Sequence, residues 1–294
     1  MRKRAPTGYR EAMTTVAVLG TGKIGAAMAR QLMAHEHDVR VWNRSEDKAK
    51  PLADDGAVVA ADPAEAARGA DVVLVVLFDA DSVVEVLEQA AAGFGEETVV
   101  VQSSTVGLDI SRVAEVADRL GVGLLDAPVL GTRGPAEQGK LTVLASGDPS
   151  LRRVADPVFK AVGARTVWVG DEVGAASRLK LVCNAWVGSI TAAIGQSVAL
   201  AEGLGLDPQL FVDAVSGSAV DAPYVAIKAG WMTSDDDSVA FDVDGVRKDL
   251  GLITAAAEGH GVDTRLLQAV KGAYDEAAEA GHGSEDMAAV RSAF

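Results

Sequence analysis

Short apolar runs alternate with alanine-rich helical stretches over the first half of the chain, and this alternation restricts the fold more than any other feature. The segment DVVLVVL at 71–77 is almost continuously apolar, as expected of a strand covered on both faces. Strands separated by helices of about 10–13 residues predict an α/β fold with a doubly wound, mostly parallel sheet. Ser45 and Asp62 are expected to cap two of these helices. The expected strands are 14–19, 39–42, 58–59, 71–77, 98–101, 122–125, 141–145 and 166–169.

The pattern changes after residue 169. Between 172 and 203 there is neither a proline nor a strand signal, and apolar residues recur at spacings of three and four, which predicts one helix of roughly 30 residues. The later segments are also expected to be helical: 208–216, 222–228, 243–258 and 264–280. We therefore expect a sheet domain at 14–172 and an all-helical domain at 173–294, with the long helix between them. Residues 1–13 are basic and then polar, and we interpret them as an N-terminal extension.

Charge, cysteine content and hydropathy exclude several classes of function. The chain has 27 lysines and arginines against 42 aspartates and glutamates, so its net charge of −15 provides no basic field for nucleic acid. The single cysteine, Cys183, can form no disulfide within the chain, so a reducing cytoplasm is the expected compartment. No uninterrupted apolar run reaches the roughly 18 residues of a membrane span. The four histidines lack metal-ligand spacing, so we expect no membrane, nucleic acid or metal partner.

A G-x-G-x-x-G motif follows the first expected strand and opens the first expected helix. Gly20 would permit a tight turn, Gly22 would let the backbone approach a pyrophosphate, and Gly25 would allow the helix to pack closely on the strand. This context predicts a dinucleotide-binding Rossmann domain, with the first helical turn facing the phosphates. The alternative is a tight turn in an unrelated α/β protein. The expected cofactor-binding turn comprises Gly20, Thr21, Gly22, Lys23, Ile24 and Gly25.

The end of the second expected strand indicates which dinucleotide is preferred. NAD sites usually carry an acidic residue there, which holds the 2′-hydroxyl of the ribose. This chain has Asn43, Arg44 and Ser45 instead, so nothing repels a 2′-phosphate, and Arg44 can pair with one in a forked geometry. Asn43 and Ser45 would add neutral donors. NADP is therefore expected over NAD, the alternative being that Arg44 is a solvated surface charge.

Four segments follow one another in a fixed order: the glycine turn, DAPVLG at 126–131 with AEQGKL at 136–141, the segment 174–184, and Phe241 followed by Lys248-Asp249-Leu250. Together they resemble the β-hydroxyacid dehydrogenases, which include 3-hydroxyisobutyrate dehydrogenases and glyoxylate/succinic semialdehyde reductases. The resemblance extends from Thr14 to the C-terminus, and PAEQG at 135–139 is most similar to the second branch, which uses NADPH.

The resemblance implies that Lys180 and Asn184 are catalytic. Because they are four residues apart on a helix, their side chains share one face. An ammonium group can stabilise a developing alkoxide and donate its proton, and apolar neighbours such as Leu181, Val182 and Trp186 would lower the lysine pKa toward neutrality. Without the resemblance, Lys180 would be a surface lysine that snorkels and Asn184 a packing amide.

The resemblance also implies further contacts. Leu130 stands where the family usually has a serine that helps to hold a substrate carboxylate, so acid substrates are in question and a less polar carbonyl compound is the alternative. Arg133 either attracts a carboxylate or is a loop charge. The resemblance places Lys248 beside the cofactor and substrate, and the alternative is that it is an exposed charge on a helix. Ala176 replaces a family glycine. Further cofactor contacts are expected from Leu77, Thr105 and Lys248, and substrate contacts from Leu130, Gly131, Thr132, Arg133, Lys180 and Asn184.

The expected function is NADPH-dependent reduction of a small aldehyde or a 2-oxo or semialdehyde acid, or the reverse oxidation of a 3-hydroxyacid, with the proton from Lys180. An imine reductase is the alternative within the same architecture, but those enzymes commonly have Asp or Tyr at the position of Lys180. A non-catalytic NADP-binding module is the alternative outside enzymes. The resemblance further implies a homodimer or homotetramer formed through the helical domain. The exact substrate and the physiological direction are left open.

Overall fold

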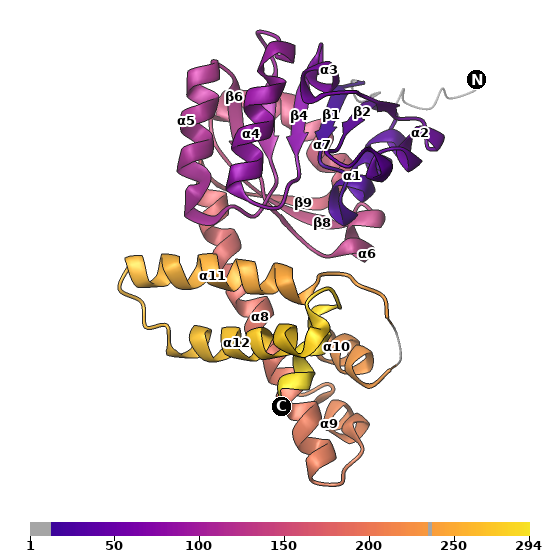
Figure 1. Ribbon diagram of the computed structural model, residues 1–294, viewed down its shortest axis with the longest axis vertical. Helices are drawn as coiled ribbons and strands as arrows, with labels where there is room; N and C mark the ends of the chain where they lie inside the picture. Colours follow the sequence, from indigo (N-terminus) through magenta and orange to yellow (C-terminus); the bar gives the residue numbers. More distant parts are fainter. Residues whose placement is uncertain (1–12, 235–236) are drawn as a thin grey trace, which may run out of the picture.

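The computed structural model describes residues 13–234 and 237–294, so the expected extension lies outside the described residues except for Met13. A sheet covered by helices on both faces forms one part of the molecule, and a group of helices forms the other (Figure 1). The chain passes from the first part to the second between residues 170 and 175. The expected fold class, a doubly wound and mostly parallel sheet followed by an all-helical part, is confirmed.

Nine strands form one sheet within the described residues, in the order β3-β2-β1-β4-β5-β6-β8-β7, with β9 also paired to β8. Strands β1 to β6 pair in parallel, whereas β8 runs antiparallel to β6 and β7. The strands are β1 Thr15–Leu19, β2 Asp38–Trp42, β3 Val58–Val59, β4 Val72–Val75, β5 Val99–Gln102, β6 Gly123–Asp126, β7 Val129–Leu130, β8 Leu141–Ser146 and β9 Gly163–Gly170.

Helices cover both faces of the sheet and form two separate cores with it. Helices α1 and α7 pack on one face through side chains such as Met28 and Phe159, whereas α3, α4 and α5 pack on the other through side chains such as Val83 and Val113. Burial on both faces explains why the strand sequences are apolar runs rather than alternating patterns. The helices are α1 Lys23–Ala34, α2 Pro51–Asp54, α3 Pro63–Ala67, α4 Ala80–Ala90, α5 Ile110–Leu120, α6 Arg133–Glu137 and α7 Arg152–Val162.

The two expected helix caps have opposite outcomes. Asp62 caps α3, because its Oδ1 accepts a hydrogen bond from the Glu65 backbone N–H at 2.7 Å. Ser45 makes no side-chain capping bond, and the helix expected to follow it is instead a 3₁₀ turn, Glu46–Lys48, and the separate helix α2. Pro51 explains the division, since a proline lacks the N–H that a continuous helix needs at that place and is tolerated only in a first turn.

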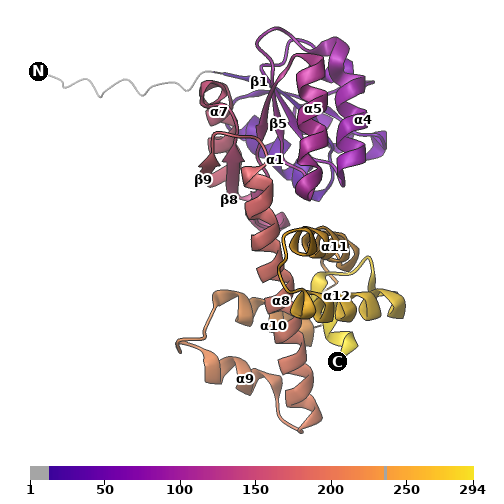
Figure 2. The same cartoon turned by 90° about the vertical axis from the view of Figure 1, so that its left-hand side faces the viewer.

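Five helices and two shorter segments make up the described residues of the second part of the molecule. The long helix α8 descends from beneath the sheet and passes through the other helices, and α11 lies directly under the sheet domain (Figure 2). The elements are α8 Ala175–Gly203, α9 Pro208–Val215, α10 Pro223–Thr233, α11 Val243–Gly259, α12 Arg265–Ala277, a π-turn Ala278–His282 and a 3₁₀ segment Met287–Ala293.

Helix α8 is the connection between the two parts. It contacts β8 and β9 near its N-terminal end and α9, α10, α11 and α12 farther along. Its 29 residues and a mean hydropathy of 1.2 over its most apolar window would also satisfy the length and composition of a membrane span. Core helices of soluble proteins satisfy the same criteria, and the contacts of α8 with both parts of the molecule are those of such a core helix.

Candidate active site

The glycine turn lies between β1 and α1, where two backbone segments approach too closely for any side chain. Gly20 has a φ of 104°, and a Cβ built there would lie 2.2 Å from the Val76 carbonyl oxygen. A Cβ on Gly25 would lie 2.0 Å from the Gly20 carbonyl oxygen. Leu77 packs beside the turn, since its Cδ2 would lie 2.8 Å from a Cβ on Gly20. Both glycines are therefore required by the geometry of the turn itself.

The start of α1 presents polar groups with no protein partner. Gly22 is the N-cap, so no side chain caps the helix, and the first turn contains no acidic residue. A Cβ on Gly22 would have no atom within 4 Å, which shows that the turn faces open space. The Thr21 hydroxyl beside it is buried and has no hydrogen-bond partner within residues 13–234 and 237–294. An uncapped helix N-terminus with an open approach fits the pyrophosphate of a dinucleotide.

The end of β2 is joined to this turn through Asn43. Its Oδ1 accepts a hydrogen bond from the Thr21 backbone N–H at 3.0 Å, and its Nδ2 donates to the Ser45 carbonyl oxygen at 3.0 Å. Asn43 therefore holds the strand end against the glycine turn. The Arg44 side chain is exposed and makes no hydrogen bond or ion pair with any described residue. It remains available to an external anion beside the turn.

Lys180 lies one turn into α8, where the helix meets the sheet domain. Its Nζ donates a hydrogen bond to the Val129 carbonyl oxygen at 2.7 Å, at the start of β7. Burial lowers the pKa of the ammonium group, while the Asp249 carboxylate opposes this change. The neighbours expected to bury the lysine do not all do so, because Val182 and Trp186 are both 67% exposed. The contact that the ammonium group makes is therefore with the sheet domain, through Val129.

Asn184 lies one turn beyond Lys180 and faces α11. Its Nδ2 donates a hydrogen bond to Asp249 Oδ2 at 2.6 Å. The Asp249 side chain is almost fully buried, and its other oxygen lies 3.0 Å from Lys248 Nζ without accepting a hydrogen bond from any described residue. A buried carboxylate thus orients the Asn184 amide and lies close enough to Lys180 to favour its charged form.

Lys248 extends from α11 to the sheet domain. Its Nζ donates hydrogen bonds to the Phe78 carbonyl oxygen at 2.8 Å and to the Thr105 carbonyl oxygen at 2.9 Å. These two carbonyl groups follow the C-terminal ends of β4 and β5, where ligands bind in open α/β sheets. The ammonium group also lies 5.0 Å from the centre of the Phe78 ring. Lys248 is therefore partly buried at the junction of the two parts and is not a free helix charge.

The segment 126–133 divides between two environments. Asp126 is fully buried, and its carboxylate accepts hydrogen bonds from the first turn of α8, so it faces the helix rather than open space. Leu130 and Thr132 are half-buried, and Gly131 is exposed with a φ of 127°. Arg133 is 57% exposed on its side chain and forms an ion pair with Glu137 at 2.7 Å.

The expected site residues thus form two groups, with Arg133 outside both. Lys180, Asn184 and Lys248 converge around Asp249, at the junction of α8, α11 and the sheet domain. The glycine turn and Arg44 form a second group at the ends of β1 and β2. Arg133 joins neither group through any contact that the structure describes.

The two buried carboxylates that bond to α8 could not be singled out from the sequence. Asp249 had been noted only as part of the motif around Lys248, and Asp126 only as the first residue of a segment expected to bind substrate. Asp249 accepts a hydrogen bond from Asn184 on α8, 65 positions away in the chain. Asp126 accepts one from Ser177 on the same helix, 51 positions away. The sequence signal available for Asp126 is its position directly after the apolar run of the expected strand 122–125.

Two family models cover the described chain almost end to end. Residues 15–170 match the NAD binding domain of 6-phosphogluconate dehydrogenase, and residues 174–294 match the NAD-binding domain of NADP-dependent 3-hydroxyisobutyrate dehydrogenase. Among curated proteins, glyoxylate/succinic semialdehyde reductase 2 of Arabidopsis thaliana is 32% identical over 96% of this chain and 80% of its own length. The 3-sulfolactaldehyde reductase of Escherichia coli is 30% identical over 95% of both chains.

Solved structures agree with this assignment. A 3-hydroxyisobutyrate dehydrogenase from Salmonella typhimurium is 27% identical and superposes with a TM-score of 0.88, covering 96% of this chain and 100% of its own. An imine reductase from Myxococcus stipitatus in complex with NADP⁺ reaches a TM-score of only 0.63 at 22% identity, covering 94% of this chain and 98% of its own, which shows the shared fold alone. The chain therefore belongs to the β-hydroxyacid dehydrogenase family, in its 3-hydroxyisobutyrate dehydrogenase-like group of NAD(P)-binding oxidoreductases that act on hydroxyl and carbonyl groups.

Proposed function

We propose that this protein uses NADPH to reduce a small aldehyde or a 2-oxo or semialdehyde acid to the hydroxy compound, with Lys180 as the proton donor. The observation that carries the proposal is the partly buried ammonium group at the junction of α8 and the sheet domain. This ammonium group, with Asn184 and Lys248, surrounds Asp249. The cluster lies beside the carboxyl ends of the sheet strands, where α/β proteins bind their ligands. The reverse oxidation of a hydroxy acid would use the same groups.

The chemistry requires a hydride and a proton, and bound NADPH supplies the hydride. The Lys180 ammonium stabilises negative charge on the carbonyl oxygen and donates the proton that completes the hydroxyl group. Because burial lowers its pKa, the ammonium gives up its proton more readily than an exposed lysine does. Asn184 is oriented by Asp249 and can hold the same substrate oxygen by a hydrogen bond.

The preference for NADP rests on Arg44 and on the absence of an acidic side chain at the end of β2. The exposed guanidinium group next to the glycine turn can form paired hydrogen bonds with a 2′-phosphate. In the proposed cofactor site, Gly20 to Gly25 hold the pyrophosphate, Asn43 and Ser45 complete the strand end, and Leu77, Thr105 and Lys248 lie along the edge of the sheet.

Substrate binding is assigned to Lys180, Asn184 and the loop 130–133. Leu130 presents an apolar side chain there, and the Arg133 charge is shared with Glu137. The relatives named for glyoxylate, succinic semialdehyde and 3-sulfolactaldehyde all act on small aldehydes that also carry an acid group, which supports a compound of this size.

We further propose the domain limits 14–172 and 173–294, a cytoplasmic location, and a homodimer or homotetramer formed through the helical domain. Support for the assembly comes from large apolar side chains that are more than half exposed on this domain, a feature of protein interfaces. They include Leu200, Leu204, Leu206, Leu210, Val220 and Ile227.

A single fluorescence experiment separates binding from turnover. NADPH is titrated into the protein, and the complex is then mixed in turn with glyoxylate, succinic semialdehyde, uncharged aldehydes of similar length and a small cyclic imine. The proposal predicts saturable NADPH binding followed by loss of its fluorescence with at least one carbonyl compound. Binding with no oxidation by any of them would favour a non-catalytic NADP-binding module, and oxidation only with an imine would favour an imine reductase.

A further inference from the structure

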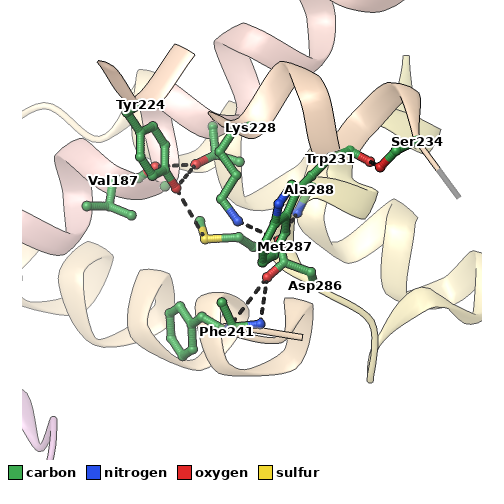
Figure 3. Close-up of polar contacts among 12 residues, drawn as sticks. Val187, Tyr224, Lys228, Trp231, Ser234, Phe241, Asp286, Met287 and Ala288 are labelled. Carbon is green, nitrogen blue, oxygen red and sulfur yellow. Dashed lines mark hydrogen bonds and ion pairs between the residues drawn. The ribbon is translucent and has the colours of Figure 1, made fainter. Parts of the chain in front are cut away.

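The helical domain contains a buried ion pair that the proposed chemistry does not use. Lys228 on α10 donates a hydrogen bond from Nζ to Asp286 Oδ1 at 2.6 Å, and the two side chains are only 4% and 8% exposed (Figure 3). Removing either partner from such a pair leaves an uncompensated charge in the interior, which is far more disruptive than breaking a surface pair. The pair therefore constrains whatever its two partners are attached to.

Lys228 belongs to a layer of side chains that joins α10 to its neighbours. Its Nζ lies 4.3 Å from the centre of the Trp231 ring, and burial lowers the pKa of Lys228 while Asp286 opposes the change. One turn earlier, the Tyr224 hydroxyl is 3.0 Å from the Thr191 hydroxyl on α8 and 3.6 Å from the sulfur of Met287 (Figure 3). These contacts hold α10 in place beside α8 and the C-terminal segment.

The Asp286 carboxylate also holds the backbone that enters α11. Its Oδ2 accepts hydrogen bonds from the N–H groups of Ala240 and Phe241 at 3.0 and 3.3 Å (Figure 3). Its Oδ1 accepts a third from the Ala288 N–H at 3.0 Å. On the other side, the Met287 N–H donates to the Phe241 carbonyl oxygen at 2.8 Å. Phe241 is thus held through both of its peptide groups by the C-terminal segment.

Phe241 connects this arrangement to the candidate active site. Its side chain packs over Gly245, where a Cβ would lie 2.5 Å from the ring. Phe241 lines a small pocket, with room for about one water molecule, together with Asn184 and Asp249. The next residue, Asp242, caps α11 by accepting a hydrogen bond from the Gly245 N–H at 2.8 Å. The carboxylate of Asp286 therefore determines where the Phe241 ring lies relative to Asn184 and where α11 begins.

We infer that Lys228 and Asp286 form a positioning pair, which holds Phe241 against the Asn184–Asp249 pocket and thereby sets the affinity for the carbonyl substrate. Because it is tested through the KM for the carbonyl substrate, this inference rests on the proposed function. The pair acts through the segment 240–242 and touches no reacting atom. Its loss should therefore raise KM much more than it lowers kcat, because Lys180 keeps its own contacts.

The experiment combines a double-mutant cycle with amide hydrogen exchange in the full-length protein. Lys228→Met is expected to raise KM for the best aldehyde by about tenfold or more, with kcat and NADPH affinity changed by less than about threefold. Phe241→Ala should raise KM similarly, and Lys228→Met should add little in the Phe241→Ala background, because both changes remove the same contact. Lys228→Arg retains the charge and should restore most of the affinity.

Lys271→Met is the matched control. Lys271 pairs with Asp275 in the same domain, at 2.6 Å, but its side chain is 35% exposed, and within the described residues the pair forms no hydrogen bond or ion pair with the segment 240–242. Amide exchange at 240–242 should accelerate in Lys228→Met and stay unchanged in Lys271→Met. If Lys228→Met fails to fold, Asp286→Asn removes the charge of the other partner with a smaller change and provides the same readouts, with Lys228→Arg still the variant that should retain the affinity.

The outcomes separate this inference from the proposed function. Additive effects on KM in the cycle, or unchanged exchange at 240–242, would overturn the positioning role even when turnover depends on Lys180. Accelerated exchange at 240–242 with unchanged KM would confine the pair to stability and also contradict the inference. Turnover that does not depend on Lys180 would instead refute the proposed chemistry, while the cycle could still be measured with whichever substrate is consumed.

Discussion

Lys180 experiences two opposing influences, and in the proposed mechanism their balance determines when it donates a proton. Burial against the sheet domain lowers its pKa below the ordinary lysine value, while the Asp249 carboxylate favours the charged form. Reduction requires the protonated amine, and oxidation of the alcohol requires the neutral one. The two directions should therefore respond oppositely to pH over the range in which Lys180 loses its proton.

The alkaline side of the pH profile tests this directly. The kcat/KM for reduction should fall as the pH rises through an apparent pKa below 10.5, the ordinary value, and the oxidation rate should rise over the same interval. Lys180→Arg keeps a positive charge to much higher pH, so it should lose rate but also lose this alkaline transition. A reduction rate that stays constant up to the ordinary lysine range would contradict the assignment.

In the proposed function, Arg44 is the residue on which cofactor preference depends. Arg44→Ala should weaken NADPH binding by about tenfold to a hundredfold and NADH binding hardly at all, since only NADPH carries the 2′-phosphate. Fluorescence titration with both cofactors measures the two constants. Lys50→Ala is the control, because its ammonium pairs with Glu46 and Asp47 in the same loop. Equal losses for NADPH and NADH would refute the role of Arg44.

Individual residues were predictable where the signal is local. The glycine spacing predicted the turn, and the close backbone contacts of Gly20 and Gly25 explain why no other residue type can replace them. The partner of Asn184 was not predictable, because Asp249 lies 65 positions away and nothing in its own sequence marks it as buried. A long-range hydrogen bond leaves no periodic pattern in the sequence.

At the scale of elements, the start of α8 depends on the end of β6. Asp126 Oδ2 accepts hydrogen bonds from the backbone N–H groups of Gly174 and Ser177 at 3.1 and 2.8 Å, and its Oδ1 accepts one from the Ser177 hydroxyl at 2.8 Å. A carboxylate at a helix N-terminus also interacts favourably with the helix dipole. Burial raises the pKa of Asp126, and these hydrogen bonds lower it. Lys180 follows Ser177 by three residues, so this cap also sets its position.

Removal of that carboxylate should affect both folding and activity. Asp126→Ala leaves buried N–H groups without partners, so we expect it to lower the free energy of unfolding by about 2–4 kcal/mol and to reduce kcat, because Lys180 is displaced. Chemical denaturation and initial rates measure the two effects. Asp148→Ala is the control, since Asp148 makes an exposed cap to Ser150 and should cost less stability and no activity. Equal losses in the two variants would contradict the anchoring role of Asp126.

The expected elements were correct where a run was long or strongly apolar, as for β4 and α8. The helix expected over 45–54 was wrong as one element, because Pro51 divides it into a 3₁₀ turn and α2. Strand β7 has only two residues and α6 only five, so neither contains enough positions to show a period. Strand β7 forms by pairing with the longer β8, and it is this pairing that places the Val129 carbonyl oxygen beside Lys180.

At the scale of the whole molecule, the active site exists only because two distant parts of the chain meet. Lys248 on α11 bonds to two carbonyl groups of the sheet domain, and Lys23 in the glycine turn lies 3.7 Å from Asp242 at the start of α11. The family resemblance implied a long helix between domains. The position of α11 under the sheet is a tertiary arrangement that no local pattern specifies.

The exposed apolar surface of the helical domain predicts association. We expect the native protein to elute as a dimer or tetramer, and Leu204→Glu to shift it to a monomer, because a charge would be buried in the interface. Leu204 is 67% exposed in the single chain. Size-exclusion chromatography with light scattering measures the mass. Val58→Glu, at a side chain 61% exposed in the sheet domain, should leave the assembly intact. A native monomer would exclude this arrangement.

The central claim is that the ammonium group of Lys180 supplies the proton for carbonyl reduction. Single-turnover oxidation of bound NADPH by the best aldehyde, compared between the native protein and Lys180→Ala, tests it most directly. We predict that the rate falls by roughly 10²–10⁴-fold while NADPH binds with unchanged affinity. Undiminished oxidation in Lys180→Ala would contradict the account.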